Sequence, residues 1–195
     1  MSLPQPSPID VTEGEFSHEE RTLLLQGAHE SILSALENRD IPVAAPSPHL
    51  AEPRGAFTSL YWNGELRGCV GYVLPVSSVY RAVIDTARAA AFEDTRFYPV
   101  TMEEARGLEI ELSILSPPRP VSADEVEVGR HGLLVSMAGH RGLLLPQVPR
   151  EHNWDRVTFL EQTCRKAGLP ADAWRRGALM EAFTAEVFRD RSILW

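Results

Sequence analysis

The chain has 195 residues, of which 44% are hydrophobic and 24% charged, an ordinary composition for a globular protein. Its formal net charge is −8 and it contains no run of lysines or arginines, so it lacks the clustered positive charge that nucleic-acid binding requires. No apolar stretch approaches the roughly 20 residues that span a bilayer, and the first residues lack the charged and apolar regions of a signal peptide. We therefore expect a cytoplasmic protein that binds neither nucleic acid nor membrane.

The chain begins with a segment that predicts disorder and continues with a helix. Residues 1–14 are rich in Pro and Ser and have no periodicity, which is typical of a disordered lead-in. Ser17 and Glu20 have the spacing of a capping box, in which each side chain bonds to the other residue's backbone N–H. Apolar residues then recur at helical spacing, at Leu24, Ala28, Ile32 and Ala35.

A β-hairpin and further elements follow in the first half of the chain. Asn63-Gly64, a strong signal for a tight turn, separates predicted strands at 56–62 and 65–72. A helix capped by Ser77 or Ser78 comes next. A short helix near 101–106 then leads to a strand at 108–115 with strict alternation.

The second half repeats this order of elements. It predicts strands at 133–137 and 140–146 around an Ala138-Gly139 turn, a helix at 154–167, and a final strand at 179–188. The Arg67-Gly68 pair of the first half corresponds to Arg141-Gly142 of the second.

We therefore predict an α+β fold within one domain spanning residues 15–195. Two β-β-α-α-β pseudo-repeats, at about 55–116 and 131–190, would form antiparallel sheets with helices packed on them. The N-terminal helix is an addition to this plan. We interpret the repetition as an internal duplication.

The hexad Leu66-Arg67-Gly68-Cys69-Val70-Gly71 carries the candidate chemistry. Alternation places Arg67, Cys69 and Gly71 on one face of the second strand, and glycines inside a strand mark close approach of a ligand or backbone. In the functional interpretation, Cys69 is a nucleophile or a soft ligand, and the charge of Arg67, about 7 Å away, favours its thiolate form. In the alternative, Cys69 is a small core residue and Arg67 is held by a carboxylate such as Asp94.

A second candidate segment, Glu93-Asp94-Thr95-Arg96-Phe97, follows the alanine-rich helix and can turn back toward the hexad. Arg67 and Arg96 could then grip a carboxylate or phosphate through forked hydrogen bonds, beside Asp94 and Phe97. The alternative is a structural ion pair of Asp94 with Arg67 or Arg96.

Histidines near the predicted hairpins are further candidates. We take His131 as a substrate-binding candidate, with His140 and His152 as other possible bases. The chain has no C-x-x-C and no H-x-x-x-H, so no metal site is predicted, and the sequence names no cofactor.

The hexad resembles the signature of the AMMECR domain family, and in particular its bacterial members in the AmmeMemoRadiSam system. Four further segments, within about residues 16–190, carry the resemblance: Gly55-Ala56-Phe57-Thr58, Asp94-Thr95-Arg96-Phe97, Leu143-Leu144-Leu145-Pro146-Gln147-Val148 and Lys166-Ala167-Gly168-Leu169-Pro170. The resemblance implies an α+β protein with two unequal lobes.

The resemblance also implies a function linked with Memo-like and radical SAM proteins. We expect an enzyme or a substrate-handling subunit that uses the Arg67 and Cys69 face, with Gly68, Gly71, Asp94 and Arg96 in the binding site. An adaptor that presents the same face to a protein partner is the alternative. Nucleic-acid binding is disfavoured by the net charge of −8.

Overall fold

The structure, a computed structural model, describes residues 14–190. The lead-in predicted for residues 1–14 therefore lies outside the described residues, apart from Gly14. The strands are β1 Gly55–Trp62, β2 Glu65–Tyr72, β3 Glu109–Leu115, β4 Arg119–Pro120, β5 Gly132–Met137, β6 His140–Leu144, β7 Leu179–Phe183 and β8 Ala185–Arg189. The helices are α1 His18–Leu36, α2 Val79–Phe92, α3 Met102–Ala105, α4 Val148–Glu151 and α5 Arg156–Lys166, with 3-10 turns at His49–Ala51 and Ala173–Arg175.

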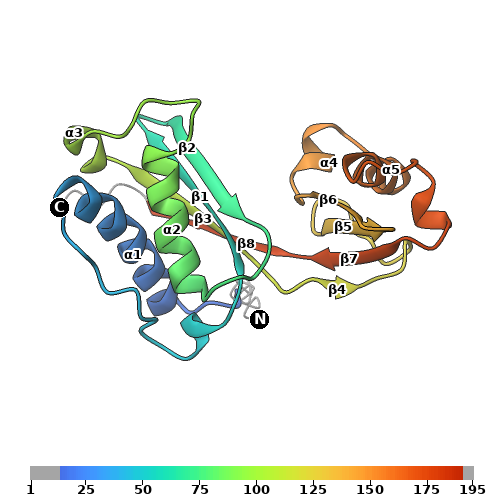
Figure 1. Cartoon of the computed structure of the whole chain (residues 1–195), viewed down its shortest axis with the longest axis horizontal. Helices are drawn as coiled ribbons and strands as arrows, with labels where there is room; N and C mark the ends of the chain where they lie inside the picture. The colour runs from blue at the N-terminus through green and yellow to red at the C-terminus, as the bar shows by residue number, and fades with distance from the viewer. Residues whose placement is uncertain (1–13, 191–195) are drawn as a thin grey trace, which may run out of the picture.

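Two lobes lie side by side, each built on a four-stranded sheet (Figure 1). All strand pairs are antiparallel, in the orders β2-β1-β3-β8 and β6-β5-β7-β4. The predicted α+β class, with antiparallel sheets, packed helices and an added N-terminal helix, is confirmed.

Helices α1 and α2 cover one face of the first sheet (Figure 1). Alternate residues of β1 are fully buried beneath them, and Thr58 shares a hydrogen bond of 2.8 Å with Thr86 of α2. The predicted capping box of Ser17 and Glu20 is present, and Ser78 caps α2. No helix of residues 14–190 covers the opposite face of this sheet, and its β1 residues are only half-buried.

The second lobe packs α5 against β5 and β6 around a smaller apolar core. Asp155 caps α5 through the Thr158 N–H, so the helix begins at Arg156 rather than at the predicted Trp154. Gly168 ends it with a φ of +74°, a conformation that favours glycine. Cys164 is fully buried in this core.

The prediction of one continuous strand at 179–188 is wrong. The chain leaves the second sheet at the end of β7 and enters the first sheet as β8, while β3 passes the other way into β4 (Figure 1). At the crossing the Ser116 N–H donates to the Thr184 carbonyl at 2.9 Å, and the Thr184 N–H donates to the Ser116 hydroxyl at 2.9 Å. These hydrogen bonds satisfy backbone groups of Ser116 and Thr184 at the point where the chain passes from one sheet to the other. The predicted strand is therefore interrupted at Thr184.

Candidate functional site

A cavity with a volume of about 1070 Å³ lies between the lobes. One wall is the open face of the first sheet, including Ser59, Cys69 and Glu111. The facing wall comes from the second lobe, at residues 129–130 and 146–151. The two walls together form the interlobe cleft.

A polar row crosses the open face of the sheet. Cys69 pairs with Ser59 across β2 and β1, Ser59 pairs with Glu111 across β1 and β3, and Glu111 pairs with Arg189 of β8. Residues directly opposite on neighbouring strands lie roughly 5 Å apart on the same face. The Ser59 hydroxyl donates to the Cys69 Sγ at 3.3 Å. The row therefore joins a thiol, a hydroxyl and a carboxylate.

Tyr61 extends the polar surface beside this row and lines the same cleft. Burial and the nearby Glu111 carboxylate raise the pKa of Tyr61, while Arg189, whose guanidinium lies 4.0 Å from the ring centroid, opposes the shift. Our sequence reasoning missed Ser59, Tyr61 and Glu111. The sequence feature that could have identified them is the alternation along β1 and β3, which places polar residues on one face of the sheet.

The prediction that Arg67 shares a face with Cys69 is wrong. The pairing of β1 with β2 shifts between Leu60 and Tyr61, so that Leu60 faces Gly68 and Tyr61 faces Leu66, which leaves Arg67 as an extra residue. This β-bulge breaks the alternation and puts Leu66 on the face of Cys69.

Arg67 turns instead to α3. Its Nε donates to Glu104 at 2.8 Å, and its Nη2 donates to Glu104 at 3.2 Å and to the Pro99 carbonyl at 3.3 Å. Arg67 thus lines a separate cavity of about 500 Å³, the rim cavity, together with Arg96 and Phe97. Arg67 and Arg96 therefore line one cavity, which does not include Cys69, and the carboxylate that holds Arg67 is Glu104 rather than Asp94.

Asp94 and Arg96 hydrogen-bond to the backbone of Cys69 on the outer edge of β2. The Cys69 N–H donates to the Asp94 carboxylate at 2.9 Å, and Arg96 Nη2 donates to the Cys69 carbonyl at 3.3 Å. The structural ion pair of Asp94 with Arg96 is confirmed, at 2.7 Å. The hydrogen bond from Arg96 holds the pKa of Asp94 well below its usual range; burial opposes this shift, and the Cys69 N–H reinforces it.

The two glycines of the hexad have packing roles. A Cβ on Gly68 would collide with the Ala90 carbonyl of α2, and a Cβ on Gly142 would collide in the same way with Ala167 after α5. A Cβ on Gly71 would collide with the ring of Phe57. These contacts account for both hexad glycines without a ligand, and their binding roles stay predictions.

The predicted histidine does not reach the thiol. His131 is buried in the second lobe, where it lines a smaller cavity, and among residues 14–190 no histidine lines the interlobe cleft. His152 stacks on Trp154, and His140 is exposed at the start of β6. Within the described part of the chain, no cluster of three or more metal-ligating side chains could hold a metal ion, and no helix has the length and apolar character to cross a membrane.

The chain is similar along most of its length to known proteins. The AMMECR1 family matches residues 25–188. A protein of Methanopyrus kandleri is 39% identical over 194 residues, 93% of this chain and 90% of the relative. A protein of Methanosarcina acetivorans is 43% identical over 150 residues, 74% of this chain and 75% of the relative. The crystal structure of the uncharacterised protein PH0010 from Pyrococcus horikoshii has a TM-score of 0.71 and 37% identity, over 87% of this chain and 90% of that one.

Proposed function

The chain belongs to the AMMECR1 family, and we propose that it is an enzyme or a substrate-handling subunit that holds a small molecule in the interlobe cleft. The observation that carries this proposal is the polar row on the open sheet face. A face that only packs against another element would carry apolar side chains, whereas this one carries Cys69, Ser59 and Glu111. A wide cavity with a few convergent polar groups is the usual form of a small-molecule site.

Cys69 is the residue that contacts the reacting group. The Ser59 hydroxyl donates to Sγ at 3.3 Å, and the exposed guanidinium of Arg96, paired with Asp94, lies at the rim of the cleft. Glu111, the next residue in the row, is the carboxylate available for proton transfer. Arg96 is therefore the arginine that lines the cleft with Cys69, the role that the sequence analysis assigned to Arg67.

The resemblance of the hexad supports a place for this chain beside Memo-like and radical SAM proteins, with which it would share a substrate or product. A cytoplasmic location fits this role, because a reducing compartment keeps Cys69 and Cys164 as the free thiols found here.

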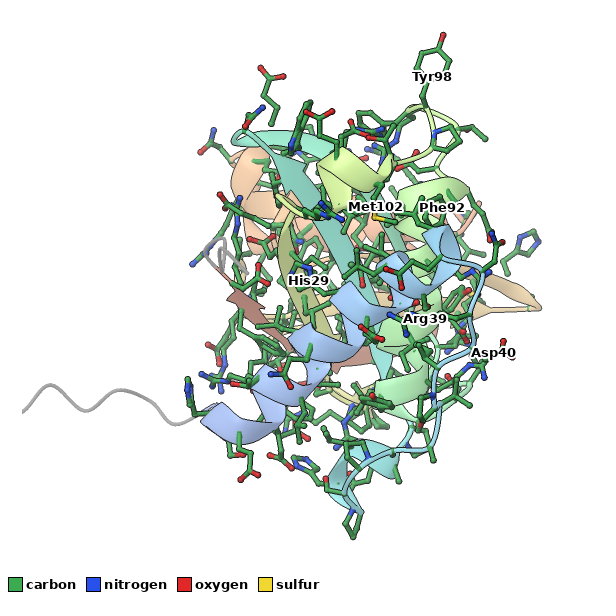
Figure 2. All side chains as sticks on the ribbon, turned by 90° about the vertical axis from the view of Figure 1, so that its left-hand side faces the viewer. His29, Arg39, Asp40, Phe92, Tyr98 and Met102 are labelled. Atoms are coloured by element: carbon green, nitrogen blue, oxygen red, sulfur yellow. The ribbon has the colours of Figure 1, made fainter. Side chains whose placement is uncertain are left out.

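A second candidate function is an adaptor that presents this region to a protein partner. Apolar side chains support it: Leu66 and Val187 line the cleft although they are 39% and 54% exposed. Tyr98, at 89% exposure, lines the rim cavity and projects from the end of the first lobe (Figure 2). Large exposed apolar side chains that lie together mark contact surfaces for proteins.

Alkylation of the folded protein by iodoacetamide distinguishes the two functions. We expect rapid modification of Cys69, detected by peptide mass mapping. Cys164 is the control within the same molecule, because it is fully buried and burial raises the pKa of its thiol. It should react only after unfolding. If Cys69 also stays unmodified until the protein unfolds, the enzyme proposal fails and the adaptor is favoured.

A further inference from the structure

A second polar cavity, which we call the neck cavity, lies where the strands cross between the lobes. It has a volume of about 340 Å³, and its wall includes Ser116, Arg119, Arg130, His131, Phe183 and Thr184. Ser116, Arg130 and Thr184 also line the interlobe cleft, so the two cavities adjoin.

The imidazole of His131 carries an unsatisfied buried nitrogen. The residue is only 3% exposed, and Nδ1 accepts a hydrogen bond from the Glu127 N–H at 3.1 Å. Because Nδ1 accepts, the proton of the neutral ring lies on Nε2. Nε2 is buried and has no hydrogen-bond partner among the described residues. Such groups are rare in folded proteins and require an explanation.

The charge around the neck cavity favours a negative occupant. Within residues 14–190 the exposed Arg119 side chain makes no hydrogen bond or close ion pair, although Glu125 feels its charge, and Arg130 pairs with the exposed Glu127 at 3.0 Å. A water molecule would satisfy the Nε2–H but would not engage the positive charge of the two guanidinium groups that line the cavity. A carboxylate or phosphate oxygen accepts from all three groups.

His131 is suited to donate while uncharged. Burial lowers the pKa of His131, Glu127 opposes this, and the positive charges of Arg130 and Arg119 add to the lowering. The ring therefore stays neutral near pH 7 and keeps its single N–H on Nε2.

We propose that the neck cavity is a binding site for a small oxyanion, carboxylate or phosphate, held by the His131 Nε2–H, Arg119 and Arg130. Since the cavity adjoins the interlobe cleft, the oxyanion is one end of the molecule whose reacting end lies at Cys69. In that respect the inference rests on the proposed function, but binding of the anion itself does not involve Cys69.

Calorimetric titration of the whole protein tests the site, with inorganic phosphate as the phosphoryl probe and succinate as the carboxylate probe, at constant ionic strength. We expect saturable binding of one of them. His131→Leu and Arg119→Gln each remove one hydrogen bond to a charged group. Each should therefore weaken binding of the probe roughly 10- to 100-fold. The probe that binds more tightly identifies the oxyanion class.

The control variants are His140→Gln and Arg165→Gln, which change exposed residues of the same lobe away from the neck cavity. Both should bind like the wild type. Arg119 is exposed, so Arg119→Gln decides the matter if His131→Leu does not fold. Absence of saturable binding by both probes would overturn the proposal, as would binding that neither site variant weakens. Alkylation of Cys69 is unaffected by that outcome, so the two proposals can fail separately.

Discussion

A single extra residue in β2 decides which side chains reach the interlobe cleft. The bulge at Arg67 sends its guanidinium to Glu104 and leaves Leu66 and Cys69 on the open face. Both partners of the Arg67–Glu104 pair are mostly buried, at 14% side-chain exposure each. Removing one partner of such a pair is costly because the other is left buried without its counter-charge. Arg67 is therefore a structural residue that fixes α3 against the hairpin.

Asp94 has an equally local role, which predicts a pH-dependent stability. Its folded-state pKa is depressed, so the stabilisation is complete above the ordinary carboxyl value of 3.8 and is lost as the pH falls toward the folded value. Asp94→Asn should lower the free energy of unfolding by about 1–2 kcal/mol at pH 7, since Asp94 is buried but Arg96 is exposed and screened. At pH 3 the difference should be smaller.

Urea unfolding at the two pH values measures this difference. The control is Asp85→Asn, which breaks the exposed pair of Asp85 with Arg81 on α2 and should cost no more than about 0.5 kcal/mol. A penalty for Asp94→Asn that is the same at pH 3 and pH 7 would contradict the account.

At the scale of elements, each lobe brings a helix unusually close to its β-hairpin. Gly68 allows the approach of α2, and Gly142, in the matching position of the second hairpin, allows the approach of the end of α5. The sequence indicated the first contact through the alanines at 87, 89, 90 and 91, which present little side chain to the strand. The Arg-Gly pairs therefore mark helix packing in both lobes.

Gly68→Ala should consequently lower the free energy of unfolding by about 1–3 kcal/mol, because the added methyl group meets backbone that cannot move aside. Gly107→Ala is the matched control. Its added Cβ would lie 3.6 Å from its nearest neighbour, an ordinary contact, so it should change stability by less than about 0.5 kcal/mol. Equal stabilities of the two variants in urea unfolding would refute the packing role of Gly68.

Local signals predicted most elements and missed what depends on pairing. Features determined by neighbouring residues could be predicted: the Asn63-Gly64 turn, the caps at Ser17 and Ser78, and the alternation in β3. The bulge at Arg67 could not be, since nothing in the hexad distinguishes a residue in register from an inserted one. Hence Cys69 was found, but its partners Ser59 and Glu111, set by cross-strand register, were not.

At the scale of the whole molecule, the two lobes exchange strands. β4 continues from the first half of the chain but completes the second sheet, and β8 continues from the second half but completes the first (Figure 1). No local pattern predicts this exchange, because a strand's sequence does not specify which sheet it will join. The crossing at Ser116 and Thr184 holds the lobes beside one another, and the interlobe cleft and the neck cavity both lie against it.

The pH dependence of the rate at which iodoacetamide alkylates Cys69 tests the central claim most directly, compared among wild type, Arg96→Gln and Arg67→Gln. We expect iodoacetamide to modify Cys69 in the folded wild-type protein. The rate should be about three- to tenfold lower in Arg96→Gln, which removes positive charge from the rim of the cleft, and unchanged in Arg67→Gln. A thiol that reacts only on unfolding, or one slowed by Arg67→Gln but not by Arg96→Gln, would contradict the account.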